Sequence, residues 1–249
     1  MLILLPPSET KRDGGVEGSR LDLSLLGFAA LGKPRRTVIA ALRKLAKNQK
    51  AMAAALHLGP TQHVEVLRNR ELVSSPTLSA VDRYTGVLYD ALDARSLSAG
   101  TRHFACRHLV IHSALFGLLR AGDPIPAYRL SHDSRLPELH LKRVWAGPIA
   151  DILDASAELV LDLRSEAYVG LGPSAGASHS YYLRVMSEGA DGVRRALNHF
   201  NKKGKGELVR AILNAGIDHQ DVESLLAWAL ASGIPLVRGA ERELVLVVR

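Results

Sequence analysis

Two apolar patterns alternate along the chain. Short uninterrupted apolar runs bounded by turn residues are typical of buried strands, and apolar residues at three- and four-residue spacing are typical of amphipathic helices. The helical patterns lie between the strand-like runs, and this alternation predicts an α/β fold, with mixed α+β as the alternative. The runs that predict strands are residues 2–5, 158–163, 181–186, 235–237 and 244–248.

Local signals predict where helices begin and end. Pro34 suits a first helical position, and the apolar spacing after it predicts one helix that Gly59 ends. The other predicted helices open at Ser75-Pro76, cover residues 141–153 and 208–213, and extend from the N-cap Asp221 to Gly233.

Composition is that of a globular chain. With 249 residues and 47% hydrophobic content, the chain can bury a large core, and without a linker we expect one domain over residues 1–249. No apolar run is long enough for a membrane helix, and no basic segment precedes residues 2–5. The single Cys106 suits a reducing compartment. We therefore expect a cytoplasmic protein with no membrane partner.

Positive charge is concentrated in two places. The net charge is +7, and clustered cations of this kind attract polyanions, although each cluster by itself also fits a solvated helix face. The first cluster is Arg35, Arg36, Arg43, Lys44, Lys47 and Lys50, and the second is Arg194, Arg195, Lys202, Lys203, Lys205 and Arg210.

The segment Phe200–Gly206 carries glycines among lysines. Such a loop lets backbone N–H groups approach an anion, and a helix beginning near Gly206 would direct its positive end toward the same place. The Walker spacing is absent, so the segment predicts a phosphate site of another kind, with a flexible basic turn as the alternative.

A second candidate site follows the glycines and prolines of residues 117–126, which predict a stiff loop leading to Tyr128 and Arg129. Arg129 suits bidentate binding of phosphate or carboxylate, and a structural arginine is the alternative. Glu166, beside Tyr168, fits either a general base or the partner that neutralises Arg129. Arg129, Glu166 and Tyr168 are the candidate catalytic residues.

The histidines at positions 103, 108 and 112 lie close to Cys106, which suggests a metal site. Apolar neighbours and the lack of a nearby carboxylate instead favour a buried strand or helix, so we expect no metal and no cofactor. Ser113 and Ser165 lack the nucleophile-elbow pattern of a serine hydrolase.

Five segments together resemble the YaaA family of bacterial peroxide-stress proteins. They are residues 1–11, 83–89, 112–130, 160–168 and 198–210. The positions that match the family are Pro7, Thr10, Tyr84, Gly86, Gly117, Tyr128, Arg129, Trp145, Tyr168, Lys202, Lys203 and Gly206. One family branch has a lysine where this chain has Glu9, and Lys11 follows two residues later.

The resemblance implies a single compact domain with a mixed sheet surrounded by helices. It also implies non-specific binding of duplex DNA and a role in limiting oxidative damage. A further implication is a helix-hairpin-helix motif, whose best match in this chain is a helix ending at Leu56, a turn over 57–60 and a helix over 61–72. We expect the five segments to converge. The alternatives are an enzyme acting on a nucleotide or nucleobase in the same basic cleft, and an iron-handling protein. The expected DNA- or phosphate-binding residues are Lys11, Tyr84, Tyr128, Arg129, Asn201, Lys202, Lys203, Lys205 and Arg210.

Overall fold

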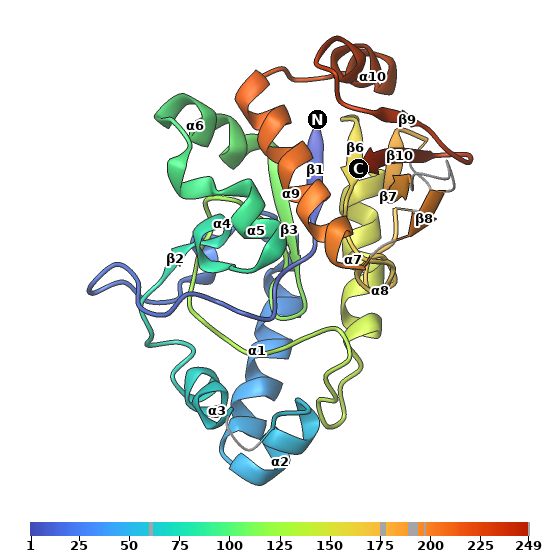
Figure 1. Ribbon diagram of the computed structural model, residues 1–249. Helices are drawn as coiled ribbons and strands as arrows, with labels where there is room; N and C mark the ends of the chain where they lie inside the picture. Colours follow the sequence, from blue (N-terminus) through green and yellow to red (C-terminus); the bar gives the residue numbers. More distant parts are fainter. Residues whose placement is uncertain (60–61, 175–177, 189–193, 197, 249) are drawn as a thin grey trace.

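The computed structural model describes residues 1–59, 62–174, 178–188, 194–196 and 198–248 (Figure 1). One interior strand of its sheet is β1 (Leu2–Leu5), whose residues are all buried. A strand covered on both faces is apolar throughout, and here both of its neighbours, β3 (Leu109–Ser113) and β6 (Val160–Asp162), run parallel to it. The apolar run at the start of the sequence is therefore an interior strand of the sheet.

The sheet continues beyond these three strands. β6 pairs in parallel with β7 (Ser180–Glu188), which pairs in parallel with β10 (Glu243–Val248). Antiparallel strands complete it: β4 (Gly117–Arg120) on β3, β9 (Leu236–Arg238) on β10, and β8 (Arg194–Ala196) on β7. The order is β4-β3-β1-β6-β7-β10-β9, which confirms the predicted α/β fold with a mixed sheet.

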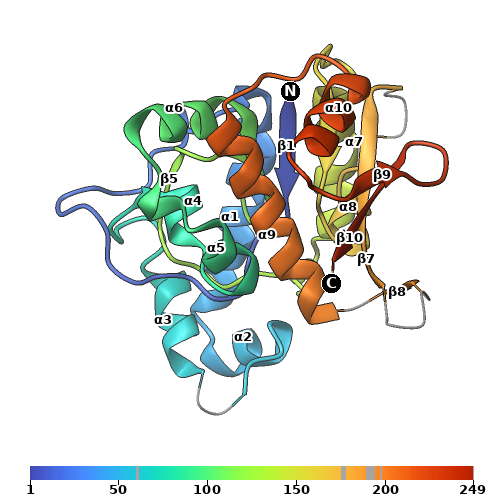
Figure 2. The ribbon, with the colours of Figure 1, turned by 45° about the horizontal axis from the view of Figure 1, so that its top comes forward.

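Helices cover both faces of this sheet (Figures 1 and 2). α9 (Asn198–Ala215) crosses one face and packs against α5 (Val87–Leu92) and α6 (Ala99–His108). α1 (Gly32–Ala46) and α7 (Leu141–Asp154) lie on the other face. One apolar core joins these layers, so the chain forms a single compact domain.

Shorter elements surround the carboxyl end of the parallel strands. α1 extends below that end and carries α2 (Gln49–Ala55) and α3 (His63–Arg70) (Figure 1). The remaining elements are β2 (Leu78–Ser79) paired with β5 (Pro124–Ile125), α4 (Ala80–Arg83), α8 (Glu166–Val169), α10 (Val222–Ala231) and the 3₁₀ helices η1 (Leu23–Leu25), η2 (Ala29–Leu31) and η3 (Ala94–Ser96).

Three predicted elements were wrong. The single helix expected from Pro34 to Gly59 is divided, because the Asn48 side chain accepts a hydrogen bond from the Ala51 N–H and caps a new helix. Ser75-Pro76 opens no helix, since β2 follows it and α4 begins at Ala80. The stiff loop after Gly117 begins instead as strand β4. By contrast, the Asp221 cap is confirmed, since its side chain accepts from the Ser224 N–H.

Candidate functional site

The loop after β1 places Lys11 beneath the carboxyl end of the sheet. The backbone of Lys11 bridges to that of Tyr84, and Arg83 fixes the loop beyond it by donating to the carbonyls of Arg12 and Gly14. Ligand sites in α/β proteins commonly lie at this end of parallel strands. Lys11 is only 7% exposed there.

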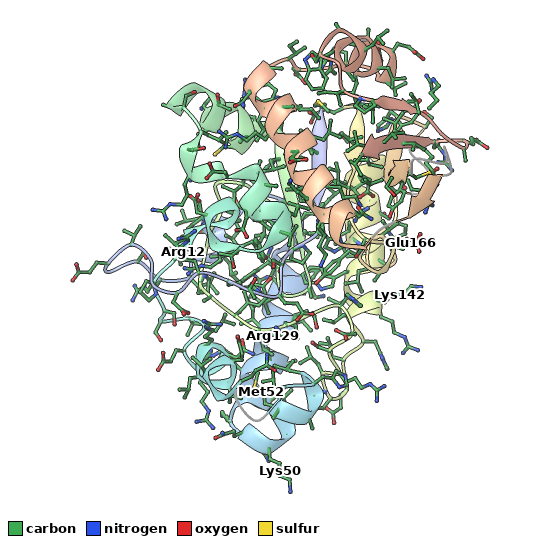
Figure 3. The ribbon with its side chains drawn as sticks, in the orientation of Figure 1. Arg12, Lys50, Met52, Arg129, Lys142 and Glu166 are labelled. Atoms are coloured by element: carbon green, nitrogen blue, oxygen red, sulfur yellow. The ribbon has the colours of Figure 1, made fainter. Side chains whose placement is uncertain are left out.

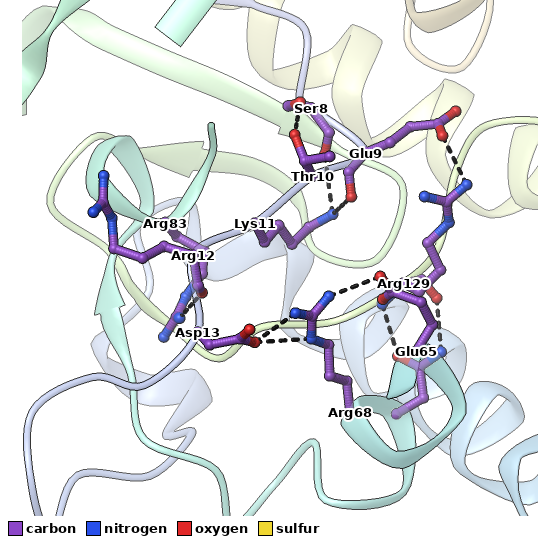
Figure 4. Close-up of polar contacts among 11 residues, drawn as sticks. Ser8, Glu9, Thr10, Lys11, Arg12, Asp13, Glu65, Arg68, Arg83 and Arg129 are labelled. Carbon is purple, nitrogen blue, oxygen red and sulfur yellow. Dashed lines mark hydrogen bonds and ion pairs between the residues drawn. The ribbon is translucent and has the colours of Figure 1, made fainter. Parts of the chain in front are cut away.

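The Lys11 amine is held by carbonyls and aromatic rings. It donates hydrogen bonds to the carbonyls of Ser8 (3.0 Å) and Glu9 (3.2 Å) (Figure 4). It also lies 4.2 Å from the ring centroid of Tyr128 and 5.4 Å from that of Tyr84. Burial is the main reason that the pKa of Lys11 is lowered to about 7. A large fraction of these amines is therefore neutral at neutral pH.

A chain of hydroxyl groups lies beside this amine. The N–H groups of Leu115 and Phe116 both donate to Ser113 Oγ (3.0 Å each), which uses the acceptor capacity of that oxygen. Ser113 therefore donates to Tyr128 Oη (2.7 Å), and a further hydrogen bond of 2.7 Å joins Tyr128 Oη to Tyr84 Oη. Burial raises the pKa of Tyr128 to about 12 and that of Tyr84 well above its usual value, so both phenols stay protonated.

Arg129 lies at the edge of this cluster, and its backbone is fixed by an amide. The Asn69 side chain donates to the Arg129 carbonyl (2.7 Å) and accepts from the Arg129 N–H (2.9 Å). The guanidinium donates to Glu9 Oε2 at 2.7 Å, and the Glu9 side chain is 66% exposed. The predicted pairing of Arg129 with Glu166 was wrong, because Glu9 from the N-terminal loop reaches it instead.

A second network connects β6 to β3. Arg164 donates through two nitrogens to the Asp162 carboxylate (2.8 and 2.6 Å) and through a third to His112 Nδ1 (3.0 Å). Since a guanidinium only donates, His112 accepts and is neutral, and burial lowers its pKa well below the usual value. The Tyr168 ring lies edge-on to His112 at 5.4 Å between centroids, so Tyr168 is a buried neighbour of this network.

Glu166 lies in a separate pocket of about 370 Å³ at the ends of β6 and β7. Its side chain is 79% exposed, and its carboxylate is 3.8 Å from the guanidinium of Arg184. Figure 3 shows Glu166 near α8 and Arg129 between the sheet and α2. The pocket is lined by Asp162, Glu166, Val169, Pro173, Ser174, Ser180, Tyr182, Arg184, Glu241 and Arg242.

The glycine-lysine segment is not the predicted loop but part of α9. A Cβ on Gly206 would lie 2.3 Å from the Leu88 carbonyl oxygen, and one on Gly204 would lie 2.8 Å from Val248 Cγ1. These glycines therefore permit close packing of α9 on α5 and β10. Their backbone N–H groups lie inside a helix, where helical carbonyls accept them, which removes the geometry of an anion-binding loop.

The polar residues of α9 have separate environments. Lys202 is exposed, Lys203 is 59% exposed and pairs with Glu207 at 3.4 Å, and Arg210 donates to the carbonyls of Leu92 and Asp93 at the end of α5. Lys205 is buried with its amine 5.7 Å from the Tyr182 ring centroid, and burial lowers its pKa to about 8. Asn201 is half-buried.

The predicted convergence is thus divided between two places. Lys11, Tyr84, Tyr128 and Arg129 form one cluster, whereas Lys205 and Glu166 lie near Asp162 and Arg184. The roles of several residues were not predicted from the sequence. Polar residues directly after an apolar run were the available signal for two of them, Asp162 and Arg164. The others were Asn69, Arg83, His112 and Ser113.

A concave basic surface lies on α1 and α3. The hollow measures about 720 Å³ and is lined by Ala40, Arg43, Lys44, Lys47 and Arg70, with no carboxylate among these lining residues. Arg35 was wrongly included in this cluster. It is buried and donates to the carbonyls of Phe116 and Leu118.

The predicted hairpin corresponds to α2, a turn and α3. In the turn, the Gly59 N–H donates to Gln62 Oε1 at 2.9 Å, while Pro60 and Thr61 lie outside the described residues. Phosphate binding by this hairpin stays a prediction.

Neither a metal-binding cluster nor a membrane-spanning helix is found in the part of the chain that the structure describes. In that part of the chain, no group of three or more His, Cys, Asp and Glu side chains could hold a metal ion. Nor does any helix in that part have the length and apolar character needed to span a membrane.

Comparisons with known proteins place these features in a family. Residues 1–232 match a family model described as peroxide stress protein YaaA. The chain is 42% identical to a UPF0246 protein of Corynebacterium glutamicum over 94% of both chains, and 40% identical to one of Corynebacterium efficiens over 100% of both. It is 39% identical to one of Streptomyces coelicolor, over 87% of this chain and 84% of the relative.

Proposed function

Because this chain belongs to the family of the peroxide stress protein YaaA, we propose that it binds duplex DNA through phosphate contacts and limits oxidative damage to that DNA. The observation that carries DNA binding is the hollow on α1 and α3. Arg43, Lys44, Lys47 and Arg70 line it together. A concave surface with cations on its walls attracts a polyanion and retains it through phosphate contacts that carry no sequence information.

The neighbouring cations extend this surface. Arg36 and Lys50 are exposed at either end of the basic stretch, and Lys50 extends from α2 away from the rest of the molecule (Figure 3). Each phosphate that a lysine or arginine neutralises releases counterions, so affinity should fall steeply with salt. If about four phosphates are neutralised, log K against log salt has a slope of roughly −3.6.

The test is a fluorescence-anisotropy titration of a labelled duplex over a range of salt concentrations. Replacing Lys44 and Lys47 by alanine should weaken binding equally for unrelated sequences and make the slope less negative by about 1.8, since two phosphate contacts are lost. The matched control replaces the exposed Arg95 and Arg107, on η3 and α6, and should leave the slope within error. A slope near zero, or equal losses in the two variants, would contradict the proposal.

The pocket at the ends of β6 and β7 favours a second candidate function, an enzyme acting on a nucleotide or nucleobase. Tyr182 offers a ring for stacking, Arg184 a cation and Glu166 a carboxylate within one pocket of about 370 Å³. This arrangement replaces Arg129 and Lys203, which the sequence suggested as phosphate ligands. Calorimetric titration with nucleosides and nucleotides tests this candidate.

A further inference from the structure

The surroundings of the Lys11 amine are those of a nucleophile, and DNA binding by itself does not require a nucleophile. A neutral amine has two N–H groups and one lone pair, and the carbonyls of Ser8 and Glu9 accept two hydrogen bonds from it. Among the described residues, no carboxylate lies within ion-pair distance of the amine (Figure 4). The neutral form is thus fully hydrogen-bonded with its lone pair free.

The adjacent hydroxyl chain supplies a proton donor. Ser113 donates to Tyr128, and one hydrogen bond joins the hydroxyls of Tyr128 and Tyr84. One phenolic proton of this pair is used in that bond, and the other has no acceptor in the hydrogen bonds of the described residues. Tyr84 lies next to Lys11, with the amine 5.4 Å from its ring centroid. This pair of groups suits a carbonyl compound, because the amine can attack the carbonyl carbon while the phenol donates a hydrogen bond to the carbonyl oxygen.

We propose that Lys11 forms an imine with an aldehyde carried by a sugar phosphate. The amine nitrogen attacks the aldehyde carbon and forms a C–N bond, while the spare phenolic proton of the Tyr84–Tyr128 pair is donated in a hydrogen bond to the carbonyl oxygen. The carbon–oxygen bond then breaks, and that oxygen leaves as water with both hydrogens that the amine carried. No oxidant or reductant is needed.

The phosphate is inferred from the cations around the amine. Arg129, 12% exposed, and Arg68, 16% exposed, both act on the charge of Lys11, so they lie close to it. Arg68 is held by the carboxylates of Asp13 (2.6 Å) and Glu65 (2.7 Å), so Arg129 is the guanidinium inferred to bind the phosphate. Arg129 is paired with the carboxylate of Glu9, which is largely exposed, so an anionic ligand can displace that carboxylate. A guanidinium binds phosphate in the same bidentate way as it binds carboxylate.

Two kinds of molecule carry both an aldehyde and a phosphate. One is a free phosphorylated aldehyde, and the other is the ring-opened sugar of an abasic site in DNA. The second source rests on the proposed DNA binding. The position of α3 supports this second source, because Arg68 on α3 lies near Lys11 and Arg70 on the same helix lines the basic hollow.

The reaction has a pH signature. Only the neutral amine attacks, and burial lowers the pKa of Lys11 to about 7, so trapping should rise with a midpoint near pH 7, well below that of a solvated lysine. The charged and titratable groups facing the amine from the surrounding elements are Glu9, Glu65, Arg68, Tyr84, Tyr128 and Arg129.

The experiment is borohydride trapping of the full-length protein, followed by peptide mass spectrometry. The probes are glyceraldehyde 3-phosphate and a duplex with a single abasic site, and binding of an intact duplex is measured in parallel. We expect one reduced adduct on the peptide containing Lys11. Lys11→Arg should lower trapping at least tenfold and Tyr84→Phe severalfold, while the exposed Lys142→Arg should match the wild type.

The outcomes separate the two proposals. An adduct on Lys11 with either probe supports the inference, and the reactive probe identifies the source. Adducts spread over exposed lysines, or none with either probe while the intact duplex still binds, would overturn the inference and leave DNA binding standing. An adduct with the free aldehyde in a protein that binds no duplex would support the inference and overturn DNA binding. Circular dichroism establishes that Lys11→Arg is folded, and the midpoint near pH 7 tests the wild type without any variant.

Discussion

At the scale of single residues, the main feature is a lysine placed where a charge is costly. Lys11 is buried among tyrosine rings, and its ammonium is compensated by carbonyls rather than by a carboxylate. The folded protein therefore holds this proton less tightly than the unfolded chain does. Between the folded pKa of about 7 and the usual 10.5, unfolding takes up a proton, so stability rises with pH across that window.

The comparison of wild type with Lys11→Met isolates this effect. Relative to the variant, the free energy of unfolding of the wild type should increase by about 2 kcal/mol from pH 7 to pH 9, because the penalty of the buried charge is relieved. Urea unfolding followed by circular dichroism at several pH values measures the difference. Parallel pH profiles for the two proteins would show that Lys11 is charged in the folded state at all these pH values.

At the scale of elements, glycines that suggested a loop serve the packing of a helix. α9 crosses α5 so closely that Gly206 lies against the backbone of Leu88 and the side chain of Ala91. Helix propensity alone would favour alanine at this position by roughly 1 kcal/mol. Contact with a neighbouring backbone outweighs that preference, since backbone atoms cannot move away as the end of a side chain can.

Gly206→Ala should accordingly destabilise the protein by about 2–4 kcal/mol, because α5 and α9 must separate to admit the methyl group. Gly100 in α6 is the control, since a Cβ there has no neighbour within 4 Å. Gly100→Ala should be neutral or stabilise by up to about 1 kcal/mol. Thermal and chemical unfolding measure both, and equal effects at the two positions would contradict the packing argument.

At the scale of the whole molecule, buried arginines hold distant segments together. Arg83 is fully buried and donates to the carbonyls of Arg12, Gly14, Pro76 and Ile125. Burial lowers its pKa to about 10, so it is still charged at pH 7. The N-terminal loop that carries Lys11 is thus fixed to the rest of the fold through one side chain.

Arg83→Met should cost about 3–5 kcal/mol of stability, because it leaves several buried carbonyls without a donor. The loop should also open locally, so limited trypsin digestion should cleave after Arg12 and Arg20 faster than in the wild type. Arg20→Met removes an exposed arginine and is the control for stability, with an expected change within about 0.5 kcal/mol. Unchanged cleavage after Arg12 in Arg83→Met would show that the loop is held by other contacts.

Much of the framework could be predicted from the sequence. Strands such as residues 2–5 and 244–248 are apolar enough that only a buried sheet position suits them, and Asp221 carries the signal of a helix N-cap. The strands and the cap depend on short-range pattern, which the sequence displays directly. Only the resemblance to the family suggested that Lys11, Tyr84, Tyr128 and Arg129 share a site, and it placed Glu166 there as well.

Other features depended on partners distant in sequence. The sequence by itself determined the α/β class, the buried strand at residues 2–5 and the residue types available for a site. Only the tertiary structure decided that Arg129 pairs with Glu9 and that the Lys11 amine is buried. It also decided that Gly206 lies directly against the backbone of α5. The physical reason is that pairing, close packing and desolvation are properties of the space between segments, which a local pattern of residues does not specify.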